Sequence, residues 1–318
     1  MQKHLAALSA AALLLSATAS SVMAQTKVVV GQVSRTAVNW PSFVAESEGM
    51  MKAEGLTLDT IYVGNVALIA QQVVGGSLDI GNTTFETAIQ AIESGAPISI
   101  IAAVAIKYPF SMMSAKDVKT AADIKGKKVI LPVPKSDMDN FMTDWLQKNG
   151  LKASDVDRIY DGSTPNRYAA LKTGAVAAAA VTSPIDFTAA AEGFNKLIDF
   201  GSYVQGYGFI AVIARKDWLA KNEQTTRAYL RAVSKGTDWV YDPANKEKAM
   251  KILMDESKQP LDVVEKTYNY FMELKPFSRG LTIPNPDIDN VIAALRANGF
   301  VKSADAPREK YVDLKYLK

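Results

Sequence analysis

Residues 75–84 read Gly75-Gly76-Ser77-Leu78-Asp79-Ile80-Gly81-Asn82-Thr83-Thr84, and residues 171–184 follow the same plan as Leu171-Lys172-Thr173-Gly174-Ala175-Val176-Ala177-Ala178-Ala179-Ala180-Val181-Thr182-Ser183-Pro184. The copies align at an offset of 98, which pairs Gly76 with Gly174. Each predicts a helix end, a glycine stop, a short apolar strand, and hydroxyl residues that open another helix. The free N–H groups and positive dipole end of such a helix can bind an anion or polar ligand. Two copies therefore predict two lobes that close on a ligand from opposite sides.

Strands and helices alternate on both sides of this repeat. In the first half, the predicted strands are 27–31, 56–63, 78–81 and 97–106, and the predicted helices are 41–53, 65–75 and 84–94. In the second half, the predicted strands are 128–131, 158–160, 175–181, 197–200 and 207–214. The alanine-rich 175–181 would be helical on propensity alone, but its place in the second copy predicts a strand.

This alternation predicts an α/β protein of two lobes, each a doubly wound sheet, joined by two hinge crossovers. Lobe one is expected to comprise 25–108 and 208–318, and lobe two 109–207. Predicted helices at 223–241, 246–256, 261–270 and 287–298 form a C-terminal tail that packs on lobe one. A single elongated α/β domain is the alternative.

The first 24 residues have the plan of a secretory signal peptide. One Lys precedes an apolar run at 5–17, and Val22-Met23-Ala24 supplies the small residues of a cleavage site before Gln25. The run is short for a membrane span, so a transmembrane anchor is the weaker alternative. No Cys follows the run, which excludes the acyl anchor of a lipoprotein. We therefore expect a soluble periplasmic protein.

Composition argues against catalysis and against nucleic-acid binding. The chain has no Cys, and its one His is His4, inside the predicted signal. The mature protein would thus lack a disulfide framework, the commonest general base, the commonest metal ligand and the thiol nucleophile. The net charge is +3 without long runs of like charge, which gives no sign of a nucleic-acid or membrane partner. We predict no enzyme, no catalytic residues, no metal and no cofactor.

Four motifs resemble periplasmic solute-binding proteins of ABC importers. They are Trp40-Pro41-Ser42-Phe43-Val44-Ala45-Glu46-Ser47-Glu48-Gly49-Met50-Met51-Lys52-Ala53-Glu54-Gly55-Leu56-Thr57-Leu58, Gly76-Ser77-Leu78-Asp79-Ile80-Gly81, Asp123-Ile124-Lys125-Gly126-Lys127-Lys128-Val129 and Gly174-Ala175-Val176-Ala177-Ala178. The branch serves importers of nitrate, taurine, alkanesulfonates and pyrimidine precursors of thiamine. In the last motif, Ala177 stands where the family usually has Asp.

The resemblance implies a two-lobe fold, a cleft for a small molecule, and delivery to a permease and its ATPase in the inner membrane. It also implies ligand contacts from the loop after the first strand, from helix starts facing the cleft and from the crossovers. With Arg167, these positions give the predicted ligand-binding residues: Arg35, Asn39, Trp40, Thr83, Thr84, Tyr108, Lys135, Ser136, Arg167, Ser183 and Tyr207.

Arg167 is singled out because an Arg near a helix start opposes the dipole, and a bound anion would compensate for it. The alternative is that Arg167 points to solvent or pairs with Asp161. Trp40 can form a pocket wall or pack in the core, and Thr83, Thr84 and Ser136 can act as helix caps alone.

The function that these observations predict is capture of a small organic anion, a sulfonate or similar, by hinge closure of a monomeric receptor. An aromatic carboxylate or a thiamine-pyrimidine-like heterocycle is the alternative ligand. A ligand sensor and an enzyme on the same fold are the other classes considered. The resemblance extends to a pyrimidine synthase of thiamine assembly, whose chemistry in that family depends on His and a Cys cluster. The mature chain would lack both.

Overall fold

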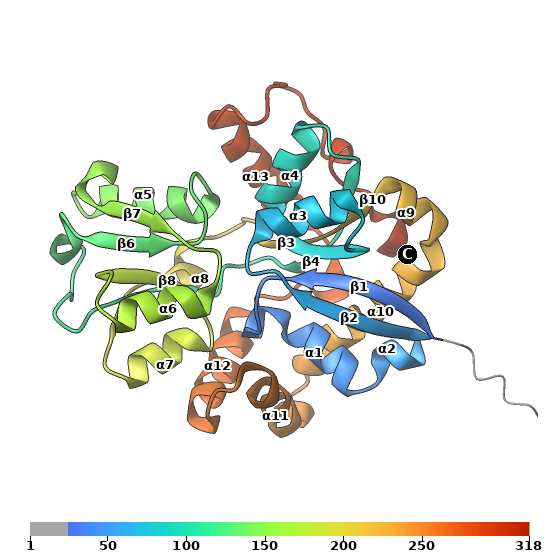
Figure 1. Ribbon diagram of the computed structural model, residues 1–318, viewed down its shortest axis with the longest axis horizontal. Helices are drawn as coiled ribbons and strands as arrows, with labels where there is room; N and C mark the ends of the chain where they lie inside the picture. Colours follow the sequence, from blue (N-terminus) through green and yellow to red (C-terminus); the bar gives the residue numbers. More distant parts are fainter. Residues whose placement is uncertain (1–24, 318) are drawn as a thin grey trace, which may run out of the picture.

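Two five-stranded sheets form the frame of the computed structural model, which describes residues 25–317 (Figure 1). The first has the order β2-β1-β3-β10-β4, built from β1 (Thr26–Gln32), β2 (Leu56–Tyr62), β3 (Ile80–Thr84), β4 (Ile98–Ala105) and β10 (Ile210–Arg215). The second has the order β7-β6-β8-β5-β9, built from β5 (Phe110–Ser114), β6 (Lys128–Leu131), β7 (Asp157–Tyr160), β8 (Ala178–Thr182) and β9 (Asn195–Asp199). We call the parts built on these sheets lobe one and lobe two. The predicted signal peptide at 1–24 lies outside the described residues.

Each sheet contains parallel strands and one antiparallel strand that enters from a crossover. In lobe one, β1 pairs in parallel with β2 and β3, while β10 runs antiparallel to β3 and β4. In lobe two, β6 pairs in parallel with β7 and β8, while β5 runs antiparallel to β8 and β9. The chain passes between the sheets twice, after β4 and after β9, which confirms the predicted two-lobe α/β class. The divisions at 108/109 and 207/208 stay predictions.

The duplicated stretch supplies the central strand of both sheets. β3 and β8 are each third in their sheet, and their first and last residues stand 98 positions apart. Gly76 and Gly174 both have positive φ, at 83° and 75°, where a side chain would be strained. All five β8 residues are buried, so burial between two strands overrides the helical propensity of alanine.

Helices cover the faces of both sheets (Figure 1). Lobe one carries α1 (Trp40–Ser47), α2 (Met50–Ala53), α3 (Val66–Gly75) and α4 (Phe85–Glu93), and lobe two carries α5 (Asp137–Lys148), α6 (Thr164–Lys172), α7 (Ile185–Ala191) and α8 (Phe200–Tyr203). The single helix predicted for 41–53 is wrong, because Gly49 adopts a left-handed conformation with φ 69° and separates α1 from α2. No strand was predicted at β5, whose five residues are all buried.

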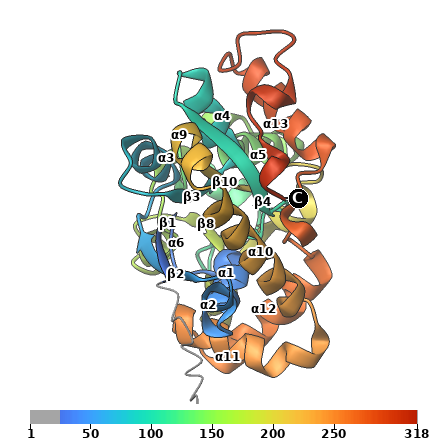
Figure 2. The same ribbon diagram turned by 90° about the vertical axis from the view of Figure 1, so that its right-hand side faces the viewer.

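The C-terminal tail packs mainly on lobe one but also reaches lobe two. It consists of α9 (Lys216–Lys221), α10 (Glu223–Val240), α11 (Lys246–Ser257), α12 (Leu261–Leu274) and α13 (Asn285–Ala297). Figure 2 shows α10 beside α1, as the contacts between them require. On α12, the Tyr270 hydroxyl donates to Asp199 of lobe two at 2.7 Å, and its ring contacts that of Phe187. The tail therefore bridges the lobes, which the sequence did not predict.

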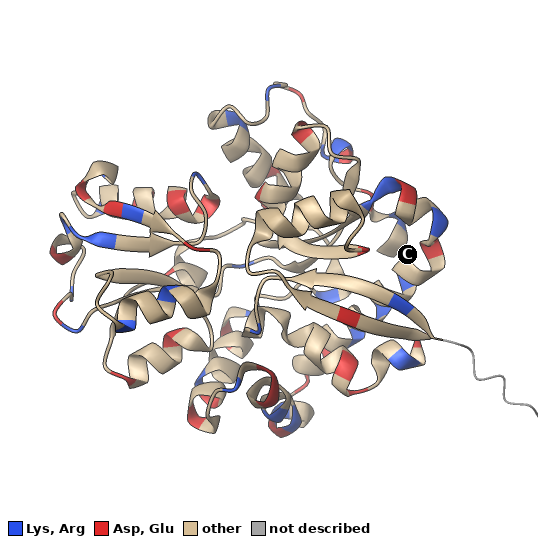
Figure 3. Cartoon of the chain, viewed as in Figure 1, with Lys and Arg blue, Asp and Glu red and all other residues tan. Residues whose placement is uncertain are grey.

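Basic and acidic residues are both distributed along the ribbons of the two lobes (Figure 3). Within residues 25–317, no helix is long and apolar enough to cross a membrane.

Candidate ligand-binding site

A pocket of about 900 Å³, measured out to its open mouth, lies where the two sheets face each other. Its walls are the loops and helix starts that follow β1, β3, β6, β7 and β8, so it lies at the carboxyl ends of the parallel strands of both sheets. The polar residues that line it are Ser34, Thr36, Asn39, Asn82, Thr84, Glu86, Thr87, Gln90, Tyr108, Ser136, Asp137, Thr164, Arg167 and Thr182.

Glu86 and Asp137 form a carboxyl pair across the lobes. The Asp137 backbone N–H, at the start of α5, donates to Glu86 Oε2 at 2.9 Å. The hydroxyls of Tyr108 and Tyr207 donate to the Asp137 carboxylate at 3.0 and 2.6 Å. Burial, and then the charge of Asp137, raises the pKa of Glu86 to about 9, while burial also raises the pKa of Asp137. The pair therefore retains a proton at neutral pH.

The pair is not part of a metal site. Among residues 25–317, no group of three or more His, Cys, Asp or Glu side chains is placed to hold a metal ion.

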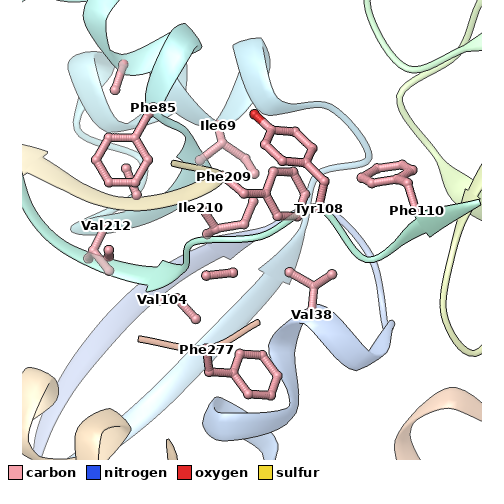
Figure 4. Close-up of a cluster of buried hydrophobic side chains, with 14 of the residues drawn as sticks. Val38, Ile69, Phe85, Val104, Tyr108, Phe110, Phe209, Ile210, Val212 and Phe277 are labelled. Carbon is pink, nitrogen blue, oxygen red and sulfur yellow. The ribbon is translucent and has the colours of Figure 1, made fainter. Parts of the chain in front are cut away.

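Aromatic rings form an apolar wall next to this pair. The rings of Tyr108 and Phe209 lie 4.4 Å apart between centroids, and that of Phe110 lies 5.6 Å from Phe209 (Figure 4). All three residues line the pocket. They come from the two crossover segments, so the wall belongs to the hinge region of the molecule.

Arg167 places a buried positive charge in the pocket wall, with only 1% of the residue exposed and its guanidinium carbon 5.9 Å from the centroid of the Phe110 ring. Its Nε donates to Ala180 O at 2.5 Å, Nη1 to Asp161 O at 2.6 Å, and Nη2 to Thr164 Oγ1 at 2.9 Å. None of these acceptors is a carboxylate, and within 25–317 no ion pair to Arg167 is formed. Burial lowers the pKa of Arg167 to about 9, and attraction to Asp161 only partly opposes this. A buried guanidinium without a counterion favours the binding of an anion.

Of the helix starts that line the pocket in α3 to α6, only that of α6 lacks a side-chain cap. Asn65 caps α3, Thr84 caps α4, and Ser136 caps α5. The α5 start also receives the Glu86 carboxylate from the other lobe. The Ser163 side chain makes no capping hydrogen bond to α6, although it stands 98 positions after Asn65. The open α6 start and Arg167 lie together in the pocket wall, where both would attract an anion.

The lobes touch beside the start of α6, at the glycines Gly64 and Gly162. A Cβ on Gly162 would overlap Gly64 O and lie 3.1 Å from Asn65 Cα. Gly64 and Gly162 are also related by the offset of 98, so equivalent points of the two lobes meet here. A second cross-lobe contact runs from Ala37 N to Ser183 O at 3.1 Å.

The structure brings five of the predicted binding residues together in the pocket wall: Asn39, Thr84, Tyr108, Ser136 and Arg167. The remaining six lie outside it. Trp40 is fully buried in the lobe-one core, where its Nε1 donates to Ala249 O at 3.0 Å. Arg35 forms an ion pair with Glu256 and covers the ring of Tyr62 at 4.3 Å.

The other four are buried or face solvent. Thr83 Oγ1 donates to Val66 O at 2.9 Å, which ties β3 to α3. Lys135 is exposed, with φ 57°. Ser183 is buried and contributes its carbonyl to the cross-lobe bond from Ala37. Tyr207 is 8% exposed and reaches the site only through Asp137.

Nine polar residues of the wall are absent from the predicted binding residues: Ser34, Thr36, Asn82, Glu86, Thr87, Gln90, Asp137, Thr164 and Thr182. Thr182 could have been found, because the offset of 98 relates it to Thr84. Thr164 could have been found from its place at the helix start before Arg167. Glu86 and Asn82 carry no such signal, since their roles depend on burial and on how the lobes dock.

Comparison with known proteins places the chain among binding proteins. A family model described as NMT1/THI5 like matches residues 37–246. The putative binding protein YtlA of Bacillus subtilis is 24% identical over 292 residues, covering 89% of this chain and 85% of YtlA.

Two solved structures show the same fold. The alkanesulfonate-binding protein SsuA of Xanthomonas axonopodis, bound to MOPS, superposes with a TM-score of 0.73 at 17% identity and covers 88% of this chain and 96% of SsuA. The nitrate-binding protein NrtA of Synechocystis gives 0.75 at 17% identity and covers 90% of this chain and 84% of NrtA. With a family model matched over most of its length, the chain belongs to the NMT1/THI5-like family.

Proposed function

We propose that the protein is the periplasmic substrate-binding component of an ABC importer and captures a small organic anion between its lobes. The observation that carries this proposal is the buried Arg167, which has no counterion and lies at the uncapped start of α6. A sulfonate or carboxylate group would accept hydrogen bonds from the guanidinium and from the open backbone N–H groups. The names of SsuA and NrtA, both anion-binding proteins, support the same class.

The apolar wall suggests the nature of the ligand's body. Tyr108, Phe110 and Phe209 face the pocket together with Val33, Val38, Val66, Met138 and Ile210. An anion with an aliphatic chain would bury its apolar surface there. The three rings specifically favour an aromatic carboxylate as the second candidate, since rings pack well in edge-to-face and offset arrangements.

Capture is proposed to occur by hinge closure about the two crossovers. The divisions at 108/109 and 207/208 make lobe two a continuous insertion in lobe one, so closure needs rotation in two segments only. The contacts of Gly162 with Gly64 and of Ala37 with Ser183 form when the lobes meet. The closed monomer would then deliver its ligand to a permease and its ATPase, without enzymatic conversion.

The binding proposal is tested by thermal unfolding of protein refolded from denaturant, from Gln25 onward, with ethanesulfonate, MOPS, benzoate or nitrate. A ligand present at a hundred times its Kd stabilises the folded state by about 2.7 kcal/mol, which raises the Tm by several degrees. Arg167→Ala should abolish the shift. Arg158→Ala is the matched control, because Arg158 is a half-buried lobe-two arginine that is paired with Asp139 outside the pocket wall.

A panel that leaves the wild-type Tm unchanged throughout would contradict the proposal, as would a shift that survives in Arg167→Ala.

The periplasmic location is tested separately. The full chain expressed in a Gram-negative host should appear in the periplasmic fraction, and N-terminal sequencing should begin at Gln25. Retention in the cytoplasm with Met1 intact would contradict the predicted export.

A further inference from the structure

The lobe-one side of the pocket contains a side chain whose hydrogen-bonding groups are all unused. Asn82 lies in the middle of β3 and lines the pocket, with 3% of the residue exposed. Neither its Nδ2 nor its Oδ1 has a hydrogen-bond partner. Buried amides are nearly always paired, because a buried donor or acceptor without a partner loses its hydrogen bonds to water and gains none in return. An amide left open at a pocket wall therefore indicates a group that the pocket binds.

Two further unpaired side chains lie behind Asn82. Ser42 Oγ on α1 and the Tyr229 hydroxyl on α10 are both buried and without a partner. Burial raises the pKa of Tyr229, and the hydrogen-bonding capacity of Asn82 and Ser42 partly opposes that rise, so the three side chains face one another. None of them reaches bonding geometry with another. The Asn82 amide thus lies near the Tyr229 and Ser42 hydroxyls, and neither its Nδ2 nor its Oδ1 forms a hydrogen bond of normal geometry.

Other polar side chains of the pocket near Asn82 already have hydrogen-bond partners within the protein. Both oxygens of Glu86 accept hydrogen bonds, from the Asp137 backbone and from Gln90. Both oxygens of Asp137 accept hydrogen bonds from tyrosines. Thr84 is committed to capping α4. Among the lobe-one residues that line the pocket, Asn82 is the one with both side-chain polar atoms buried and without a hydrogen-bond partner.

We propose that Asn82 selects the uncharged end of the bound anion, and that this end carries a hydrogen-bond donor and an acceptor together, as a carboxamide does. A primary amide can pair with the Asn82 amide through two hydrogen bonds, one in each direction. The inference rests on the proposed function, since Arg167 of lobe two holds the anionic end. The ligand then touches a different lobe at each end, and a simple inorganic anion satisfies only one of them.

The first test uses matched ligands that differ in one donor. Succinamate and glutaramate carry a carboxylate and a carboxamide, and levulinate and 5-oxohexanoate replace the amide NH₂ by a methyl group. In calorimetric titrations of wild type, each carboxamide should bind about tenfold or more tightly than its methyl ketone, as expected for an unpaired buried group. In Asn82→Leu, the two should bind within about twofold of each other.

The second test needs no ligand. Leu has the same branching and number of side-chain heavy atoms as Asn and leaves no unpaired amide, so Asn82→Leu should keep or raise the Tm of the ligand-free protein. Asn195→Leu is the matched control: the Asn195 Nδ2 donates to Ala115 O at 3.0 Å and to Val118 O at 2.9 Å, so its loss should lower the Tm. A purely structural role of Asn82, for example as a partner of a buried water, predicts a lower Tm for both variants.

Three outcomes would overturn the inference. They are a lower Tm for Asn82→Leu, equal binding of the matched ligands by wild type, or binding of simple sulfonates without any binding of the carboxamides. In the last two cases, a response that depends on Arg167 would leave the proposed function standing. Absence of binding by carboxamides, ketones and simple sulfonates alike would remove the proposed function together with the inference.

Discussion

Glu86 of lobe one accepts a hydrogen bond from the backbone N–H of Asp137 of lobe two, so a side chain of one lobe caps a helix of the other. The bond joins the first turn of α4 to the first residue of α5, directly beside the pocket. The α5 helix start, where Ser136 was predicted to contact the ligand, is thus already occupied by a group of the protein. In the proposed function, the anion therefore binds at the α6 start and Arg167.

The Glu86 pair makes stability depend on pH. With a pKa raised from 4.5 to about 9, folded Glu86 keeps a proton that the unfolded chain releases. The free energy of unfolding should therefore fall as the pH rises from about 5 to 9, by up to about 1.4 kcal/mol per unit for one proton. Glu86→Gln, which keeps an acceptor and adds a donor, should flatten this slope. Denaturant unfolding at several pH values measures it.

Glu265→Gln is the control for that slope, because Glu265 is an exposed residue paired with Lys246 on the surface. An identical slope in wild type and Glu86→Gln would show that the carboxyl pair holds no extra proton.

Gly162→Ala should weaken ligand binding without unfolding the protein. The added Cβ would overlap Gly64 O, a backbone atom that cannot swing aside, so the lobes could not meet fully. The Kd should rise about tenfold or more while the denaturation midpoint of the ligand-free protein changes little. Gly75→Ala is the control, because nothing lies within 4 Å of a Cβ there. Unchanged affinity in Gly162→Ala would mean that full closure is not needed.

Thr164→Val should reduce anion affinity through the orientation of Arg167. Thr164 Oγ1 accepts a hydrogen bond from Arg167 Nη2 at 2.9 Å and lies 3.2 Å from Thr182 Oγ1. Loss of the hydroxyl frees the guanidinium, at an expected cost of about 1 kcal/mol in binding free energy. Calorimetric titration checks it. Thr173→Val, at the exposed end of α6, should bind as wild type does, and equal losses in both variants would contradict the orienting role.

Trp40→Ala should destabilise the fold and leave ligand preference unchanged. The indole is fully buried, contacts the rings of Tyr268 and Phe271 at about 6 Å, and donates to Ala249 O. Truncation should cost about 3–5 kcal/mol of unfolding free energy, and Trp40→Phe, which loses mainly the hydrogen bond, about 1–3 kcal/mol. Denaturant unfolding and the ligand panel together decide this. A stable Trp40→Ala protein with altered preference would instead place the indole in the pocket.

The repeat made much of the fold predictable from sequence. It identified β8 as a strand although alanine favours a helix, because its position mirrors β3. The strand β5 escaped prediction, since its five buried residues show no alternation. The break at Gly49 escaped as well, because one glycine in a long helical pattern does not by itself indicate a left-handed turn.

The site was predictable where the cue is local. Arg167 stood out because its charge opposes a helix dipole. The structure adds that this charge is buried, which strengthens the case for a bound anion. Trp40 illustrates the opposite case: an aromatic residue at a loop end fits a pocket wall and a core equally well, and only the docking of α1 on the tail decides between them. Glu86 and Asp137 pair only where the two lobes meet, so the sequence of one lobe alone does not reveal the pair.

The duplication has a consequence for the direction in which a ligand lies. The offset of 98 relates Arg167 on α6 to Ile69 on α3, a fully buried residue, so the two halves carry the same framework with a cation in one and an aliphatic side chain in the other. A pocket with two equivalent halves would accept a molecule in either orientation. Because only the lobe-two position carries a guanidinium, the anion of the proposed function would lie with its charged group toward lobe two, in a single orientation.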